Sequence, residues 1–185
     1  MRPPGVVPGV PGRERRPEDP DSLPQKLPLA RGLGRAYGDA ALPAPGDVDV
    51  AGTTLADRIL SFDPVTGILK AEAGLSLDAI WRHFLPLGFV SPVSPGTRFV
   101  TLGGMVACDV HGKNHHRDGT FGRHVLALTM RTGSGELVSC SPAEHADLFH
   151  ATVGGMGLTG IVCDVTVRLT RVPSAWILGG SARVR

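Results

Sequence analysis

Three short stretches of this 185-residue chain combine glycine with polar or charged side chains. They begin at Arg31, Pro95 and Gly154. Glycine lacks a Cβ atom, so its backbone can take positive φ values and can approach a bound ligand closely. The chain has 25 glycines, and their clustering in these three stretches predicts loops built around a ligand.

The first stretch has the composition of an anion-binding loop and reads Arg31-Gly32-Leu33-Gly34-Arg35-Ala36-Tyr37-Gly38-Asp39. Its glycines allow successive N–H groups to point inward, which forms a nest for a pyrophosphate. Arg31 and Arg35 can add charge-assisted hydrogen bonds. The spacing G-x-G-x-x-x-G differs from the nicotinamide-dinucleotide fingerprint, and no Gly-Lys-Ser/Thr of a Walker loop occurs. Taken alone, the loop could also be a simple turn.

The second stretch places polar residues after a Gly-Gly pair. It reads Pro95-Gly96-Thr97-Arg98-Phe99-Val100-Thr101-Leu102-Gly103-Gly104, and Cys108-Asp109-Val110-His111-Gly112-Lys113-Asn114-His115-His116 follows shortly after. Gly103 and Gly104 would let the backbone lie against a flat or phosphate ligand. Lys113 could serve as a cation or general acid near a substrate. A hydrogen-bonded surface loop is the alternative.

The histidines His111, His115 and His116 raise the possibility of a metal site. Two histidines at i and i+4 can chelate a metal when they share a helix face. Gly112 and Gly119 argue against a helix here, and no acidic residue stands at ligand spacing. We therefore predict no metal site.

The third stretch, Gly154-Gly155-Met156-Gly157-Leu158-Thr159-Gly160, precedes an alternating strand over 161–169. Four glycines in seven residues cost conformational entropy on folding, so the pattern indicates a need for close backbone approach.

Composition narrows the classes of function. A net charge of +2 and 5% aromatic residues give no case for nucleic-acid binding. Three cysteines without a C-x-x-C pair argue against a disulfide framework. No apolar run is long enough to span a bilayer. We expect a cytoplasmic location, with peripheral attachment to a membrane as an open alternative.

The segments around these loops predict an α+β fold. Residues 1–28 carry half of the 16 prolines and are expected to form an irregular arm. Hairpins are predicted for 59–63 with 68–73 and for 124–132 with 136–140. Helices are predicted from Ser76 to Leu87, with Ser76 as the N-cap, and from Ala143 to Thr152.

The residues ARGLGRAYGDAAL, SPGTRFVTLGGMVACDVHGKNHH and ATVGGMGLTGI resemble the FAD-binding (PCMH-type) domain of the vanillyl-alcohol-oxidase superfamily. Within it, they are most similar to the branch of the decaprenylphosphoryl-β-D-ribose 2'-oxidases and their FAD-linked oxidase relatives. The resemblance spans residues 29–175 in order, between the arm 1–28 and a tail 176–185. It implies two α+β subdomains that hold an extended FAD.

The resemblance also implies roles for individual residues. The pyrophosphate would be bound by the segment from Ala30 to Ala40, together with Gly96, Thr101, Leu102, Gly103 and Gly104. Cys108, Asp109, Val110 and His111 would lie along the isoalloxazine, and Ile161 would touch another part of FAD. Lys113 would face the substrate, with His111 as a second catalytic residue. Arg35 stands where related oxidases carry a histidine that bonds FAD covalently, so noncovalent FAD is expected.

In that family the reaction oxidises a secondary hydroxyl of a lipid-linked pentose, with hydride transfer to FAD, and a reductase partner completes an epimerisation for cell-wall arabinan synthesis. The chain departs from the family in two places. The stretch before the first loop is too short and proline-rich for the family's helix, and the substrate-binding cap domain is expected to be absent. A flavin-binding remnant without turnover, or an interaction module that uses the proline-rich arm, therefore remain as alternatives.

Overall fold

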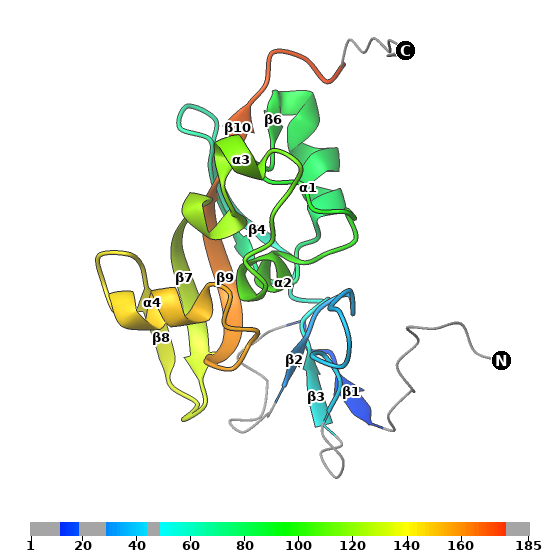
Figure 1. The fold of residues 1–185 in the computed structure, drawn as a ribbon, viewed down its shortest axis with the longest axis vertical. Coiled ribbons are helices and arrows are strands. Elements are labelled where there is room, and N and C mark those ends of the chain that lie inside the picture. Colours follow the sequence, from blue (N-terminus) through cyan, green and yellow to red (C-terminus); the bar gives the residue numbers. More distant parts are fainter. Residues whose placement is uncertain (1–11, 19–28, 44–48, 177–185) are drawn as a thin grey trace, which may run out of the picture.

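A computed structural model describes residues 12–18, 29–43 and 49–176 of the chain. The described residues form a large antiparallel sheet with helices packed on it and a smaller parallel sheet at one end (Figure 1). This mixture of helices and strands confirms the α+β prediction.

The large sheet has five strands in the order β4-β5-β9-β7-β8. These are β4 (Ile59–Asp63), β5 (Ile68–Glu72), β9 (Gly160–Arg168), β7 (Val125–Thr132) and β8 (Leu137–Cys140). Both predicted hairpins are present, since β4 pairs with β5 and β7 pairs with β8. The long strand β9 pairs with β5 and β7, so it joins the two hairpins into one sheet.

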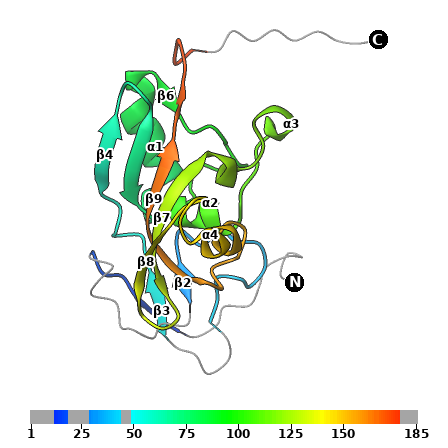
Figure 2. The same ribbon diagram turned by 90° about the vertical axis from the view of Figure 1, so that its left-hand side faces the viewer.

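Helices cover the apolar core of this sheet. The core joins inward residues of β5, β7 and β9 with residues of α1 (Leu77–Phe84), α2 (Leu102–Ala107) and α4 (Ala146–Thr152). The predicted N-cap of α1 is confirmed, because the Ser76 hydroxyl accepts a hydrogen bond from the N–H of Ala79. A 3-10 turn (Leu85–Leu87) follows α1, and Gly88 ends it with a φ of 80°. Figure 2 shows the same layers from the side.

The remaining short elements lie at the upper end of the large sheet and in the connection that leads to β7. They are β6 (Phe89–Val90), which pairs with β10 (Thr170–Arg171), the helix α3 (His115–Asp118) and a 3-10 turn (Phe121–His124).

The small sheet has the order β1-β3-β2, and both of its pairings are parallel. Its strands are β1 (Arg13–Arg15), β3 (Asp49–Gly52) and β2 (Ala30–Arg31). The prediction of an irregular arm over 1–28 is therefore wrong for 13–15, while 1–11 and 19–28 lie outside the described residues. The sequence Arg13-Glu14-Arg15 has no proline, so its backbone can pair with β3.

The number and bounds of the helices also differ from the prediction. Two helices were expected, and α2 and α3 are additional. The Gly103-Gly104 pair lowers the helix propensity of α2, but burial of Leu102, Met105 and Val106 stabilises it. Gly119 ends α3 at a φ of 74° instead of preventing it.

The second predicted helix begins later than expected. It starts at Ala146 rather than Ala143, because the Ser141 hydroxyl binds the N–H groups of Ala143 and Glu144 in a turn.

Candidate functional site

The first glycine loop leaves the small sheet at the end of β2. The carbonyl of Arg31 accepts a hydrogen bond from the N–H of Thr53, 2.9 Å away, and this contact fixes the point where the loop begins. Gly34 and Gly38 have φ values of 65° and 64°, as an inward-turning nest requires. Between Gly32 and Ala40, no N–H group donates a hydrogen bond to another described residue. These donors are therefore available to an anion.

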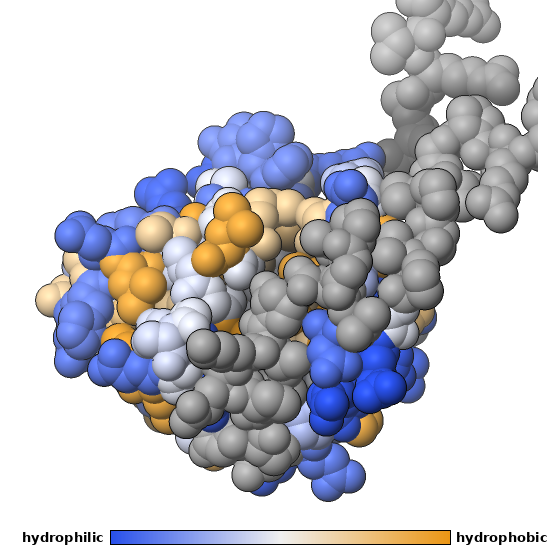
Figure 3. All heavy atoms as spheres, turned by 90° about the horizontal axis from the view of Figure 1, so that it is seen from below, coloured by the Kyte–Doolittle hydropathy of each residue, from blue (hydrophilic) through white to orange (hydrophobic). Residues whose placement is uncertain are grey.

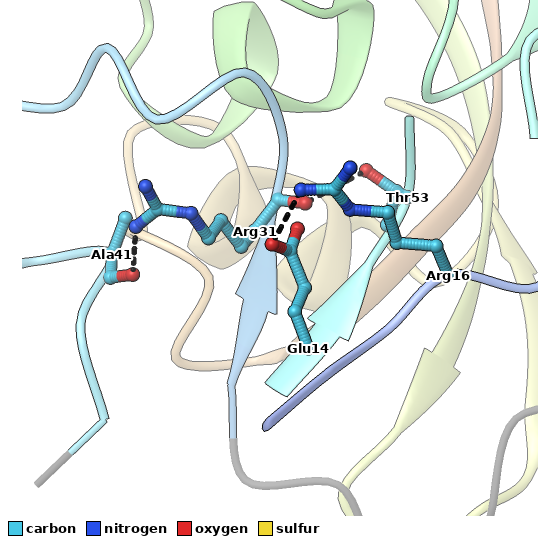
Figure 4. A network of polar contacts seen from close by, with 5 residues as sticks. All are labelled: Glu14, Arg16, Arg31, Ala41 and Thr53. Atoms are coloured by element: carbon cyan, nitrogen blue, oxygen red, sulfur yellow. Dashed lines mark hydrogen bonds and ion pairs between the residues drawn. The ribbon is translucent and has the colours of Figure 1, made fainter. Parts of the chain in front are cut away.

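Arg31 braces this loop across its width. One guanidinium nitrogen, Nη1, donates to the carbonyl of Ala41 at 2.8 Å, as Figure 4 shows. A Cβ atom at Gly34 would lie 2.5 Å from the other nitrogen, Nη2. A side chain at Gly34 would therefore displace the Arg31 guanidinium, and the φ of 65° would strain it. Arg35 and Tyr37 project from the loop as exposed side chains.

The second glycine stretch meets the first loop at the start of α2. A Cβ atom at Gly32 would collide with Oγ1 of Thr101, so the two predicted ligand-binding stretches are in contact. Thr101 caps α2, since its hydroxyl accepts a hydrogen bond from the N–H of Gly104.

The first N–H groups of α2 are already used within the protein. Leu102 donates to the carbonyl of Leu75 at 2.9 Å, and Gly103 donates to that of Ala73 at 2.8 Å. Thr101 and Leu102 are buried, whereas Gly104 is exposed. The backbone of Gly103 and Gly104 can therefore be approached closely by a ligand. Thr101 and Leu102 position the helix.

Gly96 lies in the exposed part of the stretch before α2. A Cβ atom there would have no neighbour within 4 Å. The described part of the protein would therefore leave room for a side chain at position 96.

The segment after α2 holds the residues expected beside the isoalloxazine. Asp109 has a φ of 39°, and its carboxylate accepts a hydrogen bond from the N–H of Gly122 at 2.8 Å. Val110 accepts one from Phe121, so the segment is tied to the turn before β7. Cys108 is exposed as a residue, but partial burial of its sulfur raises the pKa of the thiol. It is thus a neutral thiol at neutral pH.

His111 and Lys113 are both exposed, one on each side of the buried Gly112. A Cβ atom at Gly112 would lie 2.7 Å from the carbonyl oxygen of Ser94, so the backbone is packed tightly here. Asn114 reinforces this contact by donating to the carbonyl of Pro92 at 2.9 Å. The two predicted catalytic side chains therefore extend from a firmly held backbone.

The histidine rings stand near one another in this segment. The centroids of His111 and His115 are 5.9 Å apart, and those of His115 and His116 are 6.0 Å apart. Within 12–18, 29–43 and 49–176, no three His, Cys, Asp or Glu side chains are grouped as a metal site would require.

The third glycine stretch approaches the protein's own backbone. Cβ atoms at Gly155 and Gly160 would collide with the carbonyls of Ala151 and Arg131. The N–H groups of Gly154 and Met156 donate to the carbonyls of Val106 and Ala107 at the end of α2, at N–O distances of 3.0 and 2.8 Å. This stretch therefore holds α2 in place, and at Gly155 and Gly160 the close approach is to the protein's own backbone.

Ile161 lies where the two sheets meet. It is 6% exposed and packs with Ala51 and Ala30. A cavity of about 10 Å³ adjoins it, which is room for one water molecule at most. A larger hollow of about 330 Å³ lies elsewhere, between Asp109, Gly122 and the helix α4, which contributes Phe149 and His150.

Sequence reasoning missed several residues that shape the first loop. Ala41 acts through its backbone carbonyl and Thr53 chiefly through its backbone N–H, and residue type does not reveal such contacts. Glu14 and Arg16 form an ion pair with an N–O distance of 2.7 Å beside β3. Their spacing of two residues is the signal that both project from the same side of an extended segment.

Comparison with known proteins identifies the class to which this fold and these loops belong. A family model described as an FAD binding domain matches residues 25–141, well over half of the chain. The chain therefore belongs to this family of FAD-binding domains, and its cofactor is FAD. The resemblance to the FAD-binding domain of FAD-linked oxidases is confirmed.

Individual relatives are oxidases and dehydrogenases by name. The chain is 46% identical over 151 residues to decaprenylphosphoryl-beta-D-ribose oxidase of Mycolicibacterium smegmatis, covering 81% of this chain and 32% of that protein. It is 24% identical over 170 residues to a putative D-arabinono-1,4-lactone oxidase of Neurospora crassa, covering 89% and 30%. It is 30% identical over 152 residues to cytokinin dehydrogenase 4 of Arabidopsis thaliana, covering 78% and 28%.

The chain spans about a third of the length of these relatives. The part of the chain that the structure describes contains no helix with the length and apolar character needed to cross a bilayer.

Proposed function

We propose that this chain is the cofactor-binding part of an oxidoreductase that oxidises a sugar or polyol hydroxyl, with FAD held noncovalently. The observation that carries the proposal is the first glycine loop. Its N–H groups from Gly32 to Ala40 donate to no other described residue, and Gly34 turns the chain at a φ of 65° against the Arg31 guanidinium, where a side chain would be strained and crowded. Free donors around an open backbone cradle fit the pyrophosphate of FAD.

We place the rest of FAD along α2. The helix begins against Gly32 and ends at Cys108, and six residues of helix rise about 9 Å. A group bound at the first loop could thus extend past Gly104 towards His111. Cys108, Asp109 and Val110 would then lie along the isoalloxazine, as the family resemblance implies.

When bound, FAD supplies a hydride acceptor. His111 and Lys113 are the side chains proposed to face the substrate, and both are exposed near the end of α2. Either could hold the hydroxyl proton or orient the hydroxyl while the adjacent carbon is oxidised. A lipid-linked pentose is the proposed substrate class, because the relative at 46% identity is named for such a molecule.

The visible absorption of the purified chain tests FAD binding. We expect flavin bands that survive desalting after FAD is added, and release of the flavin into solution on denaturation. Colour that stays with the precipitated protein would instead indicate a covalent bond. A protein that stays colourless after incubation with FAD would contradict the proposal.

The variant Gly34→Val tests the site within the chain. Valine would displace Arg31 and is strained at a φ of 65°, so we expect loss of FAD retention. Gly133→Val makes the same chemical change at a turn where a Cβ has no neighbour within 4 Å, and it should retain FAD. Retention of FAD by Gly34→Val at the wild-type level would rule out this loop as the pyrophosphate site.

A further inference from the structure

The strand β1 packs beside the base of the glycine loop although it lies outside the family match. That match begins at residue 25, whereas β1 covers Arg13–Arg15 and pairs in parallel with β3. The order β1-β3-β2 puts β1 on one side of β3 and the strand that enters the loop on the other. Within the sheet, β3 therefore lies between β1 and the strand that enters the loop.

Glu14 and Arg16 occupy the space over Gly52, the last residue of β3. Arg16 donates to Glu14 with an N–O distance of 2.7 Å. A Cβ atom at Gly52 would lie 2.6 Å from both Cγ of Arg16 and Oε1 of Glu14. The Glu14–Arg16 pair thus packs on β3 at a point where only glycine leaves enough room.

The residue after Gly52 holds the start of the glycine loop. The N–H of Thr53 donates to the carbonyl of Arg31, and its hydroxyl reaches the same oxygen at 3.4 Å. Arg31 in turn spans the loop to Ala41. Figure 4 shows the Glu14–Arg16 pair beside Thr53 and the Arg31 carbonyl.

The surface at this end is strongly hydrophilic and rich in arginine, with Arg15 and Arg16 each paired to a carboxylate. Arg13, Arg15 and Arg16 are exposed, and Figure 3 shows a strongly hydrophilic patch on the side of the molecule where Figure 1 places β1. Arg16 differs from Arg13 in that its guanidinium is engaged by Glu14. Loss of Arg13 and loss of Arg16 remove the same charge, but only the second breaks the ion pair. The two variants therefore separate an effect of charge from an effect of the pair's geometry.

We propose that the Glu14–Arg16 pair is a positioning element of the FAD site, which holds Gly52 and Thr53 so that the glycine loop keeps its binding conformation. This inference rests on the proposed function, since it takes the loop as the pyrophosphate site. Neither residue need touch FAD. Loss of either partner should loosen Thr53 and weaken FAD binding.

The test is the dissociation constant of FAD, measured by quenching of flavin fluorescence, for the full chain and its variants. Glu14→Ala and Arg16→Ala should each weaken binding about fivefold, the size of effect expected from a partly exposed ion pair. The double variant with Glu14→Arg and Arg16→Glu restores the pair in reverse and should recover most of the affinity. Arg13→Ala removes an equal charge from the same strand and should change the affinity less than twofold.

The sign of the Glu14→Ala effect separates positioning from simple attraction. If charge alone mattered, removal of this carboxylate would strengthen binding of the anionic cofactor, and that result would overturn the proposal. Gly52→Ala gives a second test, because it displaces the pair without changing any charge. It too should weaken FAD binding.

Melting temperatures of the FAD-free variants distinguish a folding defect from a positioning effect. We expect them to stay near that of the wild type. A lower melting temperature with unchanged FAD affinity would overturn the proposal, as would wild-type affinity in both single variants. In either case the wild type would still bind FAD and the proposed function would stand. Failure of the wild-type chain to bind FAD would refute both.

Discussion

Arg31 and Gly34 together shape the loop proposed to hold the pyrophosphate of FAD. The backbone of Arg31 ends a strand, and its side chain crosses the loop to Ala41. Gly34 turns the chain at a φ of 65° beneath that side chain. The loop keeps its shape through these contacts, while its N–H groups remain available to an anion.

Cys108 provides a chemical probe of the flavin end of the site. Its pKa is raised above the ordinary value of 9.0 by burial, so the reactive thiolate is scarce at neutral pH. We expect slow alkylation by iodoacetamide at pH 7 that accelerates as the pH rises past that value. Bound FAD should slow the reaction further, because we place the isoalloxazine beside this residue.

Mass spectrometry after limited alkylation provides the measurement. Cys140 and Cys163 are buried and should stay unmodified in the folded chain, and Cys108→Ser should remove the label. Equal labelling rates with and without FAD would argue against the position proposed for the isoalloxazine.

His111 and Lys113 lead to a prediction about the substrate side. Their side chains are exposed, and neither forms an ion pair with another described residue. His111→Ala and Lys113→Ala should therefore retain FAD but lower the rate at which a sugar substrate bleaches its absorption, by about 100-fold for loss of a general acid–base group. Loss of FAD in both variants would place these residues in cofactor binding instead.

At the scale of elements, the helix α2 connects the two ends of the proposed site. Thr101 caps its first turn next to Gly32, and its last turn leads to Cys108. The third glycine stretch binds the carbonyls of Val106 and Ala107 and so fixes the other end. A short helix with two internal glycines is weakly stable alone, and these contacts make it a fixed surface.

The caps of α1 and α2 offer a matched pair of variants. Ser76→Ala and Thr101→Ala each remove a hydroxyl that accepts a hydrogen bond at a helix start, and each should lower stability by about 1 kcal/mol. Only Thr101 contacts the glycine loop. Thr101→Ala should therefore also weaken FAD binding, whereas Ser76→Ala should not.

Urea denaturation and FAD titration measure the two effects separately. If Ser76→Ala weakened FAD binding as much as Thr101→Ala, the effect would come from general destabilisation, and the special position of Thr101 would lose its support.

At the scale of the whole molecule, local patterns predicted the large sheet well. Alternating residues and a Pro64–Gly67 turn defined one hairpin, and β9 and the N-cap at Ser76 were also found. These elements follow from neighbouring residues. The small sheet depends on pairing between Arg13–Arg15 and Asp49–Gly52, segments far apart in sequence, so no local signal could reveal it.

The candidate site, too, was predicted where local sequence determines it and missed where long-range packing does. Glycine clustering predicted the first loop and its free backbone, and the free N–H groups between Gly32 and Ala40 fit that expectation. The third glycine stretch had a similar composition, but Gly155 and Gly160 make room for protein carbonyls. Composition reveals close backbone approach, and only tertiary structure shows whether the neighbour is a ligand or the protein itself.

The most direct test of the central claim is the change in backbone amide NMR signals when FAD is added to the isotopically labelled chain. We predict that the largest shifts fall on the N–H groups from Gly32 to Ala40, because these would donate to the pyrophosphate. ADP, which shares that group, should shift the same signals. If those signals stayed in place while amides elsewhere moved, the first glycine loop would not be the site that holds FAD.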